Sequence, residues 1–72
     1  MDRNEFLEKM VDVLQTEDEI TFNTKLEDLA EWDSLSIMAT IAFLDKNFGV
    51  KVVYADLKAM KTIEDIAIKA GI

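Results

Sequence analysis

The stretch EWDSLS, residues 31–36, stands where an irregular acidic segment gives way to a helical pattern. Asp33 and Ser34 are both good helix starters, because their side chains accept hydrogen bonds from the unpaired backbone N–H groups of a first helical turn. A broad apolar face follows and stops before Gly49, a residue suited to the left-handed position after a helix end. The sequence therefore predicts a helix over residues 34–48, with either Asp33 or Ser34 as its N-cap.

Three other segments have helical patterns. Residues 3–14 carry apolar side chains at helical spacing, and Asp2 before them is a candidate N-cap. Residues 55–60 suit one or two helical turns after an extended connector over residues 50–54. The sequence TIED, residues 62–65, matches a capping signal, and apolar residues follow at helical spacing until a closing glycine at position 71.

Residues 16–33 show no sustained hydrophobic periodicity. A loop of this length in a small domain more often has a function than serves only as a connection. A short helical turn is expected around residues 25–29. Together these segments predict an all-α fold, namely a small bundle of three main helices plus one short helix. The long loop joins the first two helices, and residues 1–72 form a single domain.

The composition excludes several classes of protein and site. The 72 residues include no Cys, which rules out disulfides and thiolate metal sites, and no His, the commonest general base and metal ligand. A formal charge of −7, from 15 acidic and 8 basic residues, argues against nucleic-acid binding. No apolar run is long enough to cross a bilayer and the N-terminus has no signal-type stretch, so we expect a soluble, cytoplasmic chain. Small size and high charge favour a monomer.

The negative charge is concentrated in the long loop. Residues 16–33 carry seven acidic side chains and one basic, whereas residues 34–72 carry four acidic and five basic ones. The acids at positions 17–19 lack the spacing and the glycine of a calcium-binding loop, so we expect no metal site. The loop is either a solvated acidic segment or a surface for a basic partner.

Ser34 is the residue at which the sequence predicts chemistry. A helix N-terminus favours an attached anion such as a phosphate ester, because backbone N–H groups and the positive end of the helix dipole point there. As a catalytic nucleophile Ser34 would need a base, but the chain has no His and Asp33 is only its neighbour in sequence. We therefore expect that Ser34 is modified by another enzyme. The chain itself is expected to have no catalytic residue and not to be an enzyme. Leu35 is expected to anchor the first helical turn in the core.

The motif Asp-Ser-Leu, placed at the start of the second helix after a long first loop, resembles the hallmark of acyl carrier proteins. The resemblance extends over the whole chain. It includes the length, the order of the helices, the acidic charge and the Phe-Gly-Val exit from the second helix at residues 48–50.

The resemblance implies that Ser34 bears 4′-phosphopantetheine, transferred from coenzyme A by a phosphopantetheinyl transferase with Mg²⁺. The arm would hold acyl or aminoacyl groups as thioesters and shuttle them between loading and accepting enzymes. A lipid, polysaccharide or secondary-metabolite pathway is implied. Asp33 and Leu35 would belong to the surface that the transferase recognises.

The chain departs from fatty-acid carriers, which usually have acidic residues two and five positions after the modified serine. Ser36 and Ala39 occupy these positions here. The departure favours a specialised, free-standing carrier with dedicated partners. Trp32, Ile37 and Met38 beside the attachment site are candidates for partner docking, although Trp32 is more readily explained as an anchor of the loop.

Four apolar residues are candidates for lining an acyl cavity between the helices: Ile41, Met60, Ile63 and Ala67. Ordinary core residues are the simpler interpretation of the same pattern.

A second class of function also fits the sequence, namely an unmodified helical adaptor that binds a protein partner through an acidic and apolar surface. The two hypotheses differ at Ser34. An adaptor tolerates Ser34→Ala with little more than a lost cap, whereas a carrier loses all function while it remains folded.

Overall fold

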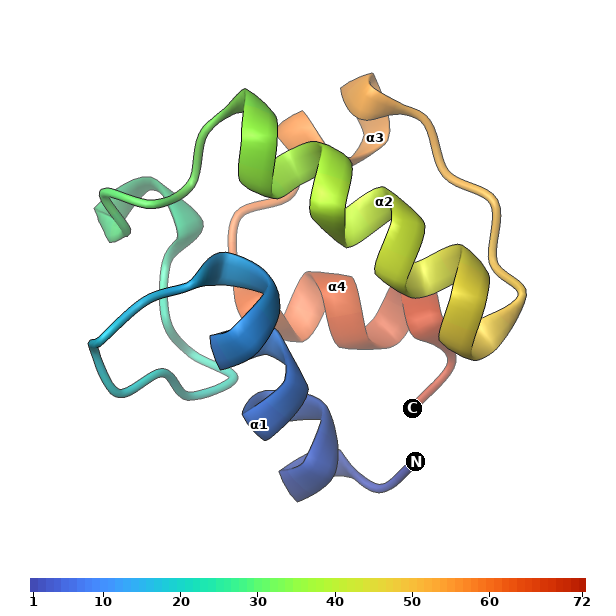
Figure 1. The fold of residues 1–72 in the computed structure, drawn as a ribbon, viewed down its shortest axis with the longest axis horizontal. Helices are drawn as coiled ribbons and strands as arrows, with labels where there is room; N and C mark the ends of the chain where they lie inside the picture. Colours follow the sequence, from blue (N-terminus) through green and yellow to red (C-terminus); the bar gives the residue numbers. More distant parts are fainter.

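The computed structural model describes residues 1–72 and is all-helical, with no strands, which confirms the predicted fold class. In Figure 1 the helix α2 lies across one side of the molecule, and α1 and α4 lie on the other. The helices are α1 (Arg3–Leu14), α2 (Ser34–Phe48), α3 (Tyr54–Lys58) and α4 (Ile63–Ala70), and a 3₁₀ turn, η1 (Leu26–Asp28), interrupts the long loop.

The helix ends are set by local chemistry, as the sequence predicts. The Asp2 side chain caps α1 by accepting a hydrogen bond from the backbone N–H of Glu5 at 2.7 Å. α2 ends at Gly49, whose φ of 67° is a left-handed conformation that a glycine adopts without a steric penalty. α3 begins one residue earlier than predicted, because the Asp56 carboxylate accepts the backbone N–H of Val53 at 3.1 Å and starts the helix at Tyr54.

One hydrophobic core joins the four helices and the long loop. It includes an aromatic group, in which the buried ring of Phe6 lies about 6 Å from those of Phe22, Phe43 and Phe48. Ile20, Leu26 and Leu29 of the loop are buried in the same core. The remaining buried apolar residues come from all four helices and the connector: Met10, Leu14, Ile37, Leu44, Val52, Leu57, Ile63, Ile66, Ala67 and Ala70.

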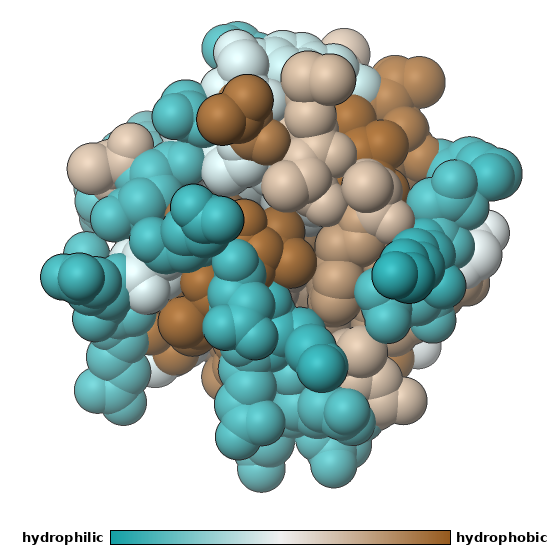
Figure 2. Space-filling view, in the orientation of Figure 1, coloured by the Kyte–Doolittle hydropathy of each residue, from teal (hydrophilic) through white to brown (hydrophobic).

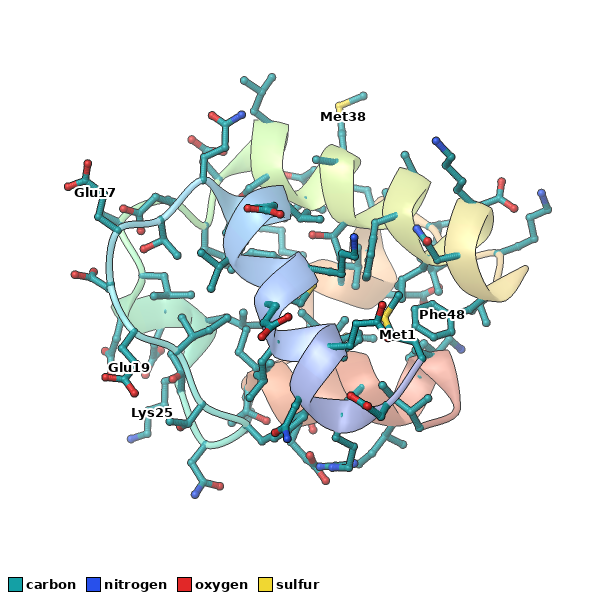
Figure 3. The ribbon with its side chains drawn as sticks, turned by 60° about the horizontal axis from the view of Figure 1, so that its bottom comes forward. Met1, Glu17, Glu19, Lys25, Met38 and Phe48 are labelled. Atoms are coloured by element: carbon teal, nitrogen blue, oxygen red, sulfur yellow. The ribbon has the colours of Figure 1, made fainter.

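The long loop is tied to the start of α4 by backbone hydrogen bonds. The N–H of Leu26 donates to the carbonyl of Lys61 at 2.8 Å, and the N–H of Ile63 donates to the carbonyl of Thr24 at 3.2 Å. These bonds and the buried apolar side chains hold the loop across the bundle. Glu17 and Glu19 project from its outer side into solvent (Figure 3).

The two chain ends lie side by side (Figure 1), where the Arg3 guanidinium donates to the carbonyl of Ile72 at 3.1 Å and pairs with the Glu64 carboxylate. No helix has the length and apolar character that crossing a membrane would require.

The start of α4 carries the one acid whose pKa is clearly displaced. The Asp65 carboxylate accepts the backbone N–H groups of Lys61 at 2.9 Å and Thr62 at 3.1 Å. These two bonds lower the pKa of Asp65 below its ordinary value, with smaller contributions from the Thr62 hydroxyl and the charge of Lys61. The folded chain therefore favours the ionised carboxylate.

We expect Asp65→Asn to remove a pH-dependent part of the stability. A pKa that is lower in the folded chain stabilises that chain above the ordinary pKa, and the contribution is lost as the pH falls through the folded-state value. The urea midpoint of the wild type should exceed that of the variant at about pH 6, and the two should converge as the pH is lowered through and below the ordinary Asp range. A difference that stays constant over this range would contradict the assignment.

Candidate functional site

Ser34 is the first residue of α2, and Asp33 is the N-cap. Asp33 Oδ1 accepts the backbone N–H of Ser36 at 3.0 Å, and Ser36 Oγ accepts the backbone N–H of Asp33 at 2.9 Å. This reciprocal pair satisfies two backbone donors of the first turn. Of the two caps that the sequence left open, Asp33 is therefore the right one, and the Ser34 side chain is not used by the helix.

The Ser34 hydroxyl is exposed and has a single side-chain partner. Its Oγ lies 2.9 Å from the phenol oxygen of Tyr54, the first residue of α3, and either oxygen can be the donor. A phenol that keeps its own proton cannot take one from the serine hydroxyl, and no His or carboxylate is bonded to Ser34 Oγ. The hydroxyl is thus accessible to another protein but is not activated by its own chain.

Leu35 does not anchor the first turn in the core, as the sequence suggested. Its side chain is 79 % exposed, whereas Ser36 and Ile37 are 7 % and 3 % exposed. The packing of Ile37 and Leu44 in the core accounts for the difference, because it places Leu35 on the opposite side of α2. Sequence reasoning had no signal for this, since apolar residues occupy both sides of the helix.

The expectation that Ile37 and Met38 share a docking surface is wrong for Ile37, which is buried. Met38 is 60 % exposed and points away from the helices (Figure 3). Trp32 is half-buried and packs against the hydrophobic core, which agrees with its interpretation as a loop anchor.

The exposed side of α2 is an apolar stripe that the sequence analysis did not separate from the core face. We call it the outer stripe. It consists of Leu35, Met38, Ala39 and Ala42, all exposed, at the i, i+3, i+4, i+7 spacing of one helical face. Apolar side chains gather at the surface over α2 in Figure 2. The only charged residues of α2, Asp45 and Lys46, lie beyond the stripe.

The four residues considered for an acyl cavity lie in or against the core. Ile63 and Ala67 are fully buried, while Ile41 and Met60 are half-buried and pack on the core. They line none of the three pockets in the structure. Their observed placement is that of ordinary core residues.

A pocket of about 360 Å³ opens beside the Ser34 hydroxyl, which we call the serine pocket. Residues from η1, the loop end, α2 and α3 surround it: Glu27, Trp32, Asp33, Ser34, Ile37, Tyr54 and Lys58. The four segments that form it are brought together only by the tertiary fold, so no local sequence pattern indicates Tyr54 or Lys58.

A second hollow, of about 270 Å³, lies on the other side of the Asp33 cap. It is lined by Glu31 and Asp33 and by Leu35 and Ala39 of the outer stripe, with Ser36 and the end of α1 completing it. One carboxylate oxygen of Glu31, Oε1, is shielded from solvent and has no hydrogen-bond partner. Unpaired carboxylate charge thus adjoins the apolar stripe. The structure has no cluster of three or more acidic, His or Cys side chains that could hold a metal ion.

The comparisons with known proteins give one finding. A protein-family model described as "Phosphopantetheine attachment site" matches residues 4–68, which include the whole of the site. No curated protein and no solved structure matches the chain.

The roles of Asp33 and Ser34 in α2 predict that their substitution affects stability to different extents. Asp33→Ala removes the N-cap and should lower the free energy of unfolding by about 1 kcal/mol. Ser34→Ala should change it by less than about 0.5 kcal/mol, because the hydroxyl is exposed and binds no backbone group. Urea denaturation followed by circular dichroism measures both values. An equal or larger loss in Ser34→Ala would show that Ser34 supports the helix.

Proposed function

Because the chain belongs to the phosphopantetheine attachment site family, we propose that Ser34 is the residue that bears its 4′-phosphopantetheine. Domains of this family are non-catalytic carriers with that group covalently attached, so the chain is a carrier protein and not an enzyme. Carriers of this kind interact with a phosphopantetheinyl transferase and with enzymes that handle the carried group.

The observation that supports Ser34 is its accessibility relative to the other serine. The chain has two serines, and a serine hydroxyl is the attachment point that the Asp-Ser-Leu motif implies. Ser36 is buried, and its Oγ both accepts the N–H of Asp33 and donates to the Asp33 carbonyl at 3.0 Å. Ser34 Oγ is exposed, binds no backbone group and faces an open pocket, so it fits an attached group that must project from the protein.

In the attachment step, Ser34 Oγ forms a new bond to the phosphorus of the phosphopantetheine half of coenzyme A. The pyrophosphate P–O bond at that phosphorus breaks, adenosine 3′,5′-bisphosphate leaves, and the hydroxyl proton passes to a base outside this chain. The attached group supplies a terminal thiol that carries acyl or aminoacyl groups as thioesters. We propose that these are delivered between enzymes of a lipid, polysaccharide or secondary-metabolite pathway.

An intact-mass measurement tests the assignment. The purified chain is incubated with coenzyme A, Mg²⁺ and a broad-range phosphopantetheinyl transferase, together with the variants Ser34→Ala and Ser36→Ala. The wild type and Ser36→Ala should each gain one phosphopantetheinyl group, and Ser34→Ala should gain none. A gain in folded Ser34→Ala would move the site to Ser36. No gain in folded wild type, also with transferases of its own host, would favour an unmodified adaptor.

We further propose that the outer stripe is where the transferase docks, with Asp33 and Leu35 as recognition residues and Met38 as an additional contact. A contiguous exposed apolar surface next to a modification site is suited to burial by a partner. Glu31 and Asp33 line the hollow beside the stripe, and the chain has a net charge of −7. The complementary partner surface is therefore an apolar patch with Lys or Arg at its rim.

A charge-neutral pair of substitutions tests this docking surface. The double variant Leu35→Gln, Met38→Gln should lower the transferase kcat/KM by about tenfold, which corresponds to about 1.4 kcal/mol of lost contact energy. Ile68→Gln is the matched control, because Ile68 is 63 % exposed but lies on α4. Equal rates for the double variant and the control would contradict docking at the outer stripe.

A further inference from the structure

We propose that Tyr54, with Lys58 one turn further along α3, holds the phosphodiester that Ser34 bears after modification, so that the attached arm leaves through the serine pocket. The proposal rests on the proposed function, because it takes Ser34 as the attachment residue. It concerns two residues that neither the motif nor the family match assigns.

The hydrogen bond between Ser34 and Tyr54 is the first support. The two hydroxyl oxygens are 2.9 Å apart, and in the unmodified chain either one can donate. Once Ser34 Oγ is an ester oxygen it has no proton, so the Tyr54 phenol is the only donor left in the pair. Its new acceptors are the oxygens of a phosphodiester anion, and hydrogen bonds to an anionic acceptor are about twice as strong as neutral ones. Modification therefore gives the Tyr54 phenol a better acceptor than it had before.

Lys58 supplies the positive charge on the same wall of the pocket. It follows Tyr54 by four residues on α3, which places both on one helical face. Its Nζ lies 5.9 Å from the centre of the Tyr54 ring, and both residues line the serine pocket. Lys58 is the only basic residue that lines the serine pocket. An anion fixed at Ser34 therefore has its cationic partner on the α3 side of the pocket.

The acidic residues of the pocket favour the same orientation. Glu27 from η1 and Asp33 also line it, and the Asp33 carboxylate is bound to the backbone of Ser36. A phosphodiester at Ser34 is repelled by both carboxylates and attracted by Lys58, so it turns toward α3. Tyr54 is half-buried and packs against the core, which keeps the phenol in place to receive it.

The modified protein contains a single phosphorus, which makes ³¹P NMR a direct probe of the contact. The variants are Tyr54→Phe, which removes only the hydroxyl, and Lys58→Gln, with Lys46→Gln in the last turn of α2 as the charge-matched control. Intact mass first establishes that each chain is loaded, and circular dichroism that each is folded. We expect the ³¹P resonance of the loaded protein to shift in Tyr54→Phe and in Lys58→Gln, and to stay unchanged in Lys46→Gln.

Salt and tryptophan fluorescence separate the two contributions. The Lys58→Gln shift should shrink in about 1 M NaCl, where the Debye length is about 3 Å, while the Tyr54→Phe shift should persist. Trp32 is the only tryptophan and lines the same pocket, so acrylamide should quench its fluorescence less in the loaded than in the unloaded wild type. This protection should be lost in loaded Tyr54→Phe.

Two results would overturn the proposal while leaving the proposed function intact. One is a fully loaded Tyr54→Phe whose ³¹P resonance and Trp32 quenching match those of the loaded wild type. The other is a folded Tyr54→Phe that the transferase cannot load, because Tyr54 would then act in recognition by the transferase rather than on its product. Failure to load the folded wild type would instead refute the proposed function itself.

Discussion

The reciprocal hydrogen bonds between Asp33 and Ser36 fix the start of α2, the helix that carries the site serine. They start α2 at Ser34 and so set which residues of the first turn face inward. Ser34 is thereby held as the first residue of the helix, where its Oγ lies 2.9 Å from the phenol oxygen of Tyr54. The same bonds engage the second serine of the chain and leave the first one unengaged. Ser36 therefore has a structural role, whereas the hydroxyl of Ser34 stays accessible.

The helix that follows is apolar on two opposite sides, and only one of them is covered. Ile37, Phe43 and Leu44 belong to the core, and the buried hydroxyl of Thr40 is satisfied within the helix by the carbonyl of Ser36 at 2.8 Å. The outer stripe has no such cover within the chain. An uncovered apolar face lowers solubility, and the carboxylates of the long loop, which carry much of the net charge of −7, offset that effect.

The sequence was sufficient for features that depend on local chemistry. The bounds of α1 and the start and end of α2 and α4 follow from caps and glycines that lie within a few residues of one another. The orientation of α2 could not be predicted, because a helix with apolar residues on both sides has no distinctive inner face. For the same reason the expected anchoring of Leu35 in the core is wrong, and Ile37, a candidate for partner docking, is buried instead. Tyr54 and Lys58 depend on how α3 packs against the start of α2, and no local pattern encodes that placement.

The acidic surroundings of Ser34 look unsuited to a phosphate, and covalent attachment resolves the difficulty. The serine pocket is lined by two carboxylates and one ammonium group, so it offers no net attraction to a free anion in solution. Under the proposed attachment at Ser34 a phosphodiester would not have to be attracted, because the covalent bond itself would hold it beside Tyr54 and Lys58 at a high effective concentration. Repulsion from Glu27 and Asp33 would then determine only the direction in which the phosphodiester points. The negative charge that keeps free anions out is thus compatible with the proposed attachment at Ser34, and it would help to orient the attached anion.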